Sequence, residues 1–233
     1  MNYLMFIWAE GRPAPEDLAV MQREIPGWVE EMGGRGVRLL GRELRLPETA
    51  VTVRVRDGET LVTDGPFLET KEFMAGFDLL DCADLDEAIE VAAETPVSWF
   101  QTVELRPFAD RVRLSEEASA FGREDDSAGT PYLLMMWVDG EVVMPDDEAW
   151  RRDVDARGLL VLGDPLQGAE TATTVRVRDG ETLLGDGPFT GTERFIAGID
   201  VVRCADRRQA IELAAAHPLA RRHAIEVRPF YSE

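Results

Sequence analysis

The sequence of 233 residues has few cysteines and no long apolar run, and both shortages exclude classes of protein. Cys82 and Cys204 are too few for a disulfide-rich secreted scaffold, and they lack the CxxC spacing of metal or redox sites. The apolar run at residues 3–8 has no basic flank and is too short for a signal peptide or a membrane span. We therefore expect a cytoplasmic protein that makes no contact with membranes.

Basic charge is also scarce. The chain has 25 lysines and arginines against 45 acidic residues, a net charge of −20, and such a field repels nucleic acids and anionic lipids. The only histidines, His217 and His223, have no further ligand at metal-binding spacing, and glycine-rich phosphate loops are absent. The sequence thus predicts no nucleic-acid partner, no metal and no cofactor.

An internal repeat organises the chain. Residues 3–8 recur at 132–137, and residues 52–61 recur identically at 174–183. An acidic, polar stretch separates the two copies, as is typical of a solvated linker. We therefore expect a first copy at residues 1–110, a linker at 111–130 and a second copy at 131–233.

Local patterns predict the elements of each copy. In the first copy, residues 3–8, 51–56, 59–63, 75–80 and 103–108 have the pattern of strands, and residues 15–33 and 85–94 that of helices. Asp57-Gly58 predicts a two-residue hairpin turn. Asp84 and Glu87 form a capping box before the second helix. The order indicates an α+β unit of the split βαβ type.

Two helices cover only one face of a small sheet, so the other face of each copy needs cover. A tether of roughly 20 residues holds the copies at an effective concentration of about millimolar order. We therefore expect an intrachain pseudo-dimer, in which the two sheets meet within one chain. Further homo-oligomers remain open.

Asp64 is the first candidate for chemistry. The Asp57-Gly58 turn sets a register in which Val53 faces Val62 and Val51 faces Asp64, so Asp64 should end an inward-facing ladder and be partly desolvated. Such a carboxylate suits a general acid or base. Alternatively, Asp64 has a structural role in the turn formed with Gly-Pro.

Lys71 is the second candidate, because it is the only lysine in the chain. Lysine can lose its proton in a desolvated site, so Lys71 could act as an acid, a base or an anchor for a carboxylate, with Glu69 and Glu72 beside it as ligand-binding groups. It could equally be a surface lysine among acidic neighbours. Trp8, at the end of the first strand, could wall a pocket or fill the core.

The chain resembles the DGPF branch of the YCII-related proteins in three segments. These are Asp64-Gly-Pro-Phe67, the preceding hairpin and the equivalent Asp186-Gly-Pro-Phe189. The resemblance implies a ferredoxin-like unit that pairs into a dimeric α/β barrel. It also implies a transcription-related protein partner, because genes of this branch often neighbour those of alternative sigma factors. The histidine–aspartate pair proposed as catalytic in the YciI-like branch has no counterpart in residues 1–200, which lack histidine.

Two functions remain open on these residues. The first is a metal-independent enzyme for a small molecule, an isomerase, lyase or hydrolase, that uses Asp64 and Lys71. The second is a non-catalytic module that binds a small molecule or regulates a partner. The substitutions Gly191 for Glu69 and Glu193 for Lys71 in the second copy confine any chemistry to the first.

Overall fold

The structure is a computed structural model, and it describes most of the chain. The residues described are 1–11, 13–68, 70–112, 114, 118, 121, 129–139, 145–191 and 193–231. They form two structural units, and each unit contains segments from both sequence copies. No helix among these residues is long and apolar enough to cross a membrane.

Unit 1 comprises residues 1–43, 70–112 and 166–192. Its sheet has the strand order β10-β9-β6-β1-β5-β2. The elements are β1 (Asn2–Glu10), α1 (Pro15–Gly34), β2 (Arg38–Glu43), β5 (Glu72–Asp81), α2 (Leu85–Glu94), η2 (Pro96–Trp99), β6 (Thr102–Pro107), η3 (Ala169–Thr171), β9 (Thr173–Arg178) and β10 (Glu181–Asp186).

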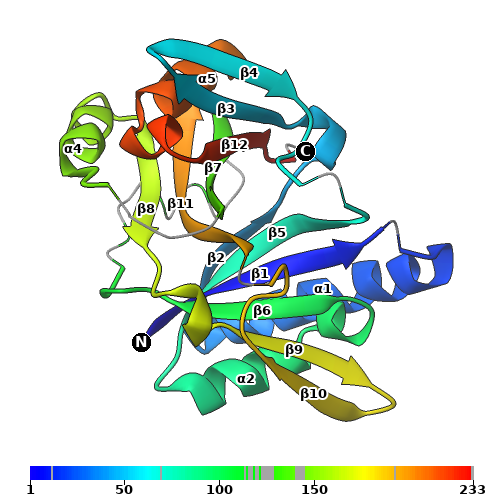
Figure 1. Ribbon diagram of the computed structural model, residues 1–233. Helices are drawn as coiled ribbons and strands as arrows, with labels where there is room; N and C mark the ends of the chain where they lie inside the picture. Colours follow the sequence, from blue (N-terminus) through cyan, green and yellow to red (C-terminus); the bar gives the residue numbers. More distant parts are fainter. Residues whose placement is uncertain are drawn as a thin grey trace. The chain divides into compact units, whose positions relative to one another are not determined.

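The part β6-β1-β5-β2 of this sheet, with its two helices, is the ferredoxin-like core that the sequence predicts. Both helices lie on one face of the sheet (Figure 1), where Trp28 and Met32 of α1 and Val91 of α2 join a core with Met5 and Val103. Side chains that point to the other face, such as Leu4, Phe6 and Leu79, are also buried. Neither face of the sheet is therefore left in water.

Unit 2 comprises residues 44–69, 113–165 and 193–233, and it repeats this plan. Its sheet has the strand order β4-β3-β12-β7-β11-β8. The elements are η1 (Pro47–Thr49), β3 (Val51–Arg56), β4 (Glu59–Asp64), β7 (Thr130–Asp139), α4 (Glu148–Ala156), β8 (Leu160–Pro165), β11 (Arg194–Cys204), α5 (Arg207–Ala216), η4 (Pro218–Arg221) and β12 (Ala224–Pro229).

The two copies exchange their hairpins. The β3–β4 hairpin of the first copy pairs with β12 of the second, where Thr52 lies opposite Glu226. The β9–β10 hairpin of the second copy pairs with β6 of the first, where Thr174 lies opposite Glu104. The sequence copies 1–110 and 131–233 and the structural units thus do not coincide. The expected meeting of the two sheets stays a prediction.

The local signals of the sequence appear where they were expected. Asp57 and Gly58 have φ angles of 53° and 81°, as a two-residue hairpin turn requires. The register across this turn places Val53 opposite Val62. At the start of α2, the Asp84 carboxylate accepts a hydrogen bond from the Glu87 N–H, and the Glu87 carboxylate accepts one from the Ala83 N–H. The N-cap bond of the predicted capping box is confirmed, whereas the reciprocal bond goes to Ala83, one residue before the N-cap.

The strands β2 and β8 were not predicted, and each supplies a glycine beside a buried aspartate. Gly41 of β2 lies opposite Asp78 of β5, and Gly163 of β8 lies opposite Asp200 of β11. A β-carbon on Gly163 would lie 2.1 Å from Oδ1 of Asp200, so only glycine leaves room for this carboxylate. The periodicity of apolar residues did not predict these strands, because each contains only a short apolar run.

We expect Gly163→Ala to destabilise the protein by about 1–3 kcal/mol, because the new methyl group overpacks the buried carboxylate. Gly33→Ala is the matched control: no atom lies within 4 Å of its β-carbon position, and in helix α1 alanine should stabilise by up to about 1 kcal/mol. Urea unfolding measures both changes. Equal effects of the two substitutions would contradict the packing argument.

Candidate functional site

The Asp64–Phe67 segment forms a turn at the end of β4. Gly65 has a φ angle of +100°, which favours glycine, and its N–H donates to the Ala50 carbonyl at 2.9 Å. The Thr52 hydroxyl donates to the Gly65 carbonyl at 3.2 Å. The Phe67 ring then lies between the two copies: it stacks on Trp137 of the second copy, and Cζ of Arg54 in the hairpin lies 5.3 Å from its centroid.

Glu226 of β12 holds this turn in place, and we call Glu226, Arg228, Trp137 and Phe67 the glutamate anchor of unit 2. Oε2 of Glu226 accepts hydrogen bonds from the Phe67 N–H at 3.0 Å and from Nε1 of Trp137 at 3.1 Å. Oε1 accepts from Nε of Arg228 at 3.0 Å. The rings of Phe67 and Trp137 stack with centroids 5.3 Å apart.

Unit 1 has the same glutamate anchor, formed by Glu104, Arg106, Trp8 and Phe189. Oε2 of Glu104 accepts hydrogen bonds from Nε1 of Trp8 and from the Phe189 N–H, both at 3.0 Å. Its Oε1 pairs with Nη2 of Arg106 at 2.5 Å. Both glutamates are about 1% exposed. Because their oxygens are occupied by fixed donors and closed to solvent, the anchors are structural.

Asp64 does not have the environment that the sequence suggested. The register with Val51 is as predicted, but β4 is an edge strand whose residues are all exposed, and the Asp64 side chain is 94% exposed. Its Oδ1 accepts a hydrogen bond from Nη2 of Arg207 at 3.2 Å. The expected desolvation of Asp64 is therefore wrong, because none of the described residues forms a layer over this strand.

The other candidates fall in different places. Lys71 and Glu72 are exposed and belong to unit 1, whereas Asp64 belongs to unit 2. Glu69 lies outside the described residues. Trp8 is 2% exposed and uses its indole in the anchor of unit 1, which agrees with core packing. The catalytic role of Asp64 and Lys71 and the ligand-binding role of Trp8, Glu69 and Glu72 stay predictions.

The two cysteines are buried and free. Burial raises the pKa of the Cys82 thiol to about 11 and that of the Cys204 thiol to about 12. Because the thiolate is the reactive form, both side chains are inert at neutral pH and serve as small core residues. Among the residues that the structure describes, no cluster of His, Cys, Asp and Glu could hold a metal ion.

A buried charged network in unit 2 was missed by the sequence analysis. Arg151 of α4 contacts Asp200 at 3.2 Å and Asp147 at 3.0 Å. His217, which follows α5, places Nε2 at 3.5 Å from Asp147 and at 3.8 Å from Asp200, while its Nδ1 accepts the Leu219 N–H. Asp200 and His217 are at most 1% exposed, so a substrate cannot reach them.

Burial raises the pKa of Asp200 above its usual range, against the effect of the basic groups of the network. Its pKa rises to about 6, although Arg151 and His217 act to lower it. Burial also acts to raise the pKa of Asp147, but His217 and Arg151 outweigh this effect and hold it below the usual value. In unit 1 the equivalent Asp78 pairs instead with Arg38 at 2.6 Å. The histidine of the network thus belongs to unit 2.

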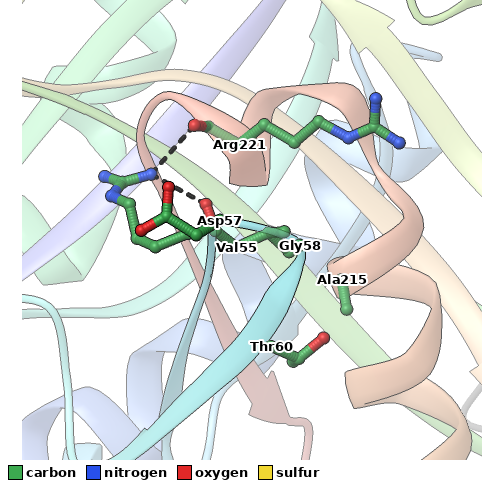
Figure 2. A pocket seen from close by; sticks show the side chains of 7 residues that line it. Val55, Asp57, Gly58, Thr60, Ala215 and Arg221 are labelled. Carbon is green, nitrogen blue, oxygen red and sulfur yellow. Dashed lines mark hydrogen bonds between the residues drawn. The ribbon is translucent and has the colours of Figure 1, made fainter.

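A pocket of about 610 Å³ opens in unit 2 at the tip of the β3–β4 hairpin. It is lined from the first copy by Val55, Arg56, Asp57, Gly58 and Thr60, and from the second copy by Ala215 and Arg221 (Figure 2).

Arg56 fixes the hairpin over this pocket. Its Nη1 donates to the Arg221 carbonyl at 2.9 Å, and its Nη2 donates to the Arg222 carbonyl at 3.3 Å. In unit 1, Arg178 makes the same contacts to the carbonyls of Trp99 and Phe100. The hairpin exchange therefore builds the pocket of unit 2 from both copies. Sequence reasoning could not find it, because its two walls are about 160 residues apart.

We expect Glu226→Gln to destabilise the protein by about 3–5 kcal/mol, because it removes the buried carboxylate that pairs with the buried Arg228. Asp64→Asn, at a side chain that is 94% exposed in an edge strand, should change stability by less than about 0.5 kcal/mol. Urea unfolding compares them. If the two substitutions lower the free energy of unfolding by the same amount, the turn depends on Asp64 as much as on the anchor.

We expect Asp200→Asn to stabilise the protein more at pH 7.5 than at pH 4.5. Folded Asp200 holds its proton up to a pKa of about 6, whereas an unfolded aspartate releases it near about 3.9. Its contribution to stability is thus full below about pH 4 and is lost as the pH rises through about 6. Urea unfolding at both pH values measures the difference.

Asp153→Asn is the control for this experiment, because Asp153 lies on the same helix α4 and its side chain is 67% exposed. Its effect on stability should stay within about 0.5 kcal/mol in both measurements, because the side chain is exposed. An Asp200→Asn effect that does not change between pH 4.5 and pH 7.5 would contradict the proton assignment.

Comparison with known proteins gives a family and a relative. The model of the YCII-related domain matches residues 1–109 and 139–232. Over 57 residues the chain is 54% identical to an uncharacterized protein of Rhizobium meliloti (strain 1021), a stretch that covers 24% of this chain and 46% of that relative. The matched part thus spans about half of the relative's length. Since the two family matches cover most of the sequence, the chain belongs to the YCII-related family, with two tandem copies of the domain.

Proposed function

We propose that the protein is a small-molecule-binding module that holds its ligand in the unit 2 pocket without turning it over. One observation carries the proposal: the pocket of about 610 Å³ between the β3–β4 turn and the α5–η4 segment. Its volume lies within the range of roughly 300–1,000 Å³ that is typical of small-molecule sites.

The composition of the pocket wall supports binding. Val55 and Ala215 offer apolar surface, and Thr60 offers a hydroxyl group. Arg56 is held by three backbone carbonyls, its own neighbour Val55 included, so the wall is formed before any ligand arrives. A preformed wall reduces the entropy cost of binding.

The placement of the reactive side chains supports a non-catalytic role. The buried carboxylates Glu104 and Glu226 are occupied by fixed donors, and the network around Asp200 is closed to solvent. Asp64 and Lys71 are exposed to water and are not among the residues that line the pocket. The polar residues that line the pocket are arginine, aspartate and threonine, and no histidine, cysteine or lysine is among the described lining residues.

We expect a fragment library screened against the ¹⁵N-labelled protein to give compounds that shift the amide signals of Gly58 and Ala215. Ala215→Phe should abolish these shifts, because the larger side chain fills the pocket. Ala93→Phe, at the equivalent position of α2 in unit 1, is the matched control and should leave them intact.

Bound compounds should be recovered unchanged after prolonged incubation, as followed by proton NMR. Two results would overturn the proposal. One is a library that shifts no signal of the pocket, and the other is the conversion of a bound compound at a rate that Ala215→Phe abolishes.

A further inference from the structure

The unit 2 pocket contains a positive charge that has no partner among the described residues. The Arg221 guanidinium makes no ion pair there, whereas Arg207 is paired with Asp64 and Arg208 with Glu212. In Figure 2 the side chains of Arg221 and Asp57, the one acidic residue of the pocket lining, extend away from each other. The cation at the rim is therefore available to a ligand.

The equivalent place in unit 1 has no such charge. Residue for residue, the two hairpin turns are identical, and Ala93 corresponds to Ala215. Arg221, however, corresponds to Trp99, whose side chain is 39% exposed. The two units thus differ in one charged side chain at the rim. This difference gives unit 2 an attraction for anionic groups that unit 1 lacks.

From this arrangement we infer that the pocket binds a small monocarboxylate with an apolar body. The carboxylate pairs with Arg221, since guanidinium and carboxylate form charge-assisted hydrogen bonds of matching geometry. The Thr60 hydroxyl can donate a further hydrogen bond, and the apolar body covers Val55 and Ala215. This inference rests on the proposed binding function.

The charges around the pocket limit the ligand to one negative charge. Two arginines, Arg56 and Arg221, and one aspartate, Asp57, line the pocket, so the lining carries one net positive charge and Asp57 repels a second anionic group. The chain as a whole carries a charge of −20, which further disfavours di- and polyanions. Phosphates and dicarboxylates should therefore bind more weakly than a monocarboxylate of the same size.

The test uses the full chain and matched pairs of probes that differ only in charge. The pairs are butyrate with butyramide and phenylacetate with phenylacetamide, and phenylmalonate serves as the dianion. Dissociation constants come from NMR titration of the Gly58 and Ala215 amides. Each acid should bind about fivefold more tightly than its amide, the scale of one exposed ion pair, and phenylmalonate should bind no more tightly than phenylacetate.

Arg221→Gln should make each acid bind no more tightly than its amide, and it should leave the dissociation constants of the amides unchanged. Arg208→Gln removes one exposed positive charge from α5, where Arg208 is 80% exposed, and should preserve the advantage. The amides of Gly180 and Ala93 in unit 1 should show no preference for acids, because Trp99 replaces the arginine there. Raised salt should weaken the acids alone.

The outcomes separate the ligand class from the binding function. If acids and amides shift the pocket signals equally, or if the preference survives Arg221→Gln, the monocarboxylate inference is wrong while the pocket still binds small molecules. If the fragment library finds ligands and none of these acids shifts the signals, the inference is again overturned. If neither the library nor these probes shift them, the proposed function fails as well.

Discussion

The exchange of hairpins between the two copies depends on a buried glutamate in each unit. Glu226 and Glu104 lie on strands that would otherwise leave a carboxylate in an apolar interior, where an unpaired charge is costly. The N–H of Phe67 or Phe189, the indole of a tryptophan and a neighbouring arginine satisfy that charge. Each donating turn comes from the opposite copy, so neither copy can satisfy its glutamate alone.

This requirement explains the Asp-Gly-Pro-Phe segment in physical terms. Glycine supplies a φ angle of about +100° at Gly65 and +85° at Gly187, and the proline that follows has a fixed backbone angle. Together they aim the next N–H at the glutamate and stack the phenylalanine on the tryptophan. Because both copies keep this geometry while their downstream residues differ, the motif belongs to the architecture of the fold.

The sequence predicted what is local and missed what is distant. The turn at Asp57-Gly58, the N-cap at Asp84 and the α+β class follow from residues a few positions apart, and the structure confirms them. The exchange could not be predicted, because residues 52–61 and 174–183 are identical and their pattern fits either copy equally well. The burial of Asp64 was predicted wrongly because the exchange was not foreseen. Register sets which face a side chain takes, but the neighbouring layer decides whether that face is buried. The network around His217 was missed because Asp147 and Asp200 approach it only through packing of α4, β11 and α5.

The duplication separates architectural residues from residues free to diverge. Substitution within a glutamate anchor would leave a charge or donor unsatisfied in the core, so both anchors keep the same four residue types. At the rim of the pocket no such penalty applies, and there the copies differ: an arginine stands in unit 2 where unit 1 has a tryptophan. The buried aspartate also has different partners, Arg38 in unit 1 and Arg151 with His217 in unit 2. Since η4 begins directly after His217 and ends at Arg221, the copies differ at both ends of this short segment, and Arg221 lines the pocket. The copies therefore differ at η4, in the pocket that we propose to bind a ligand, while the sequence of the exchanged hairpin turns is the same in both.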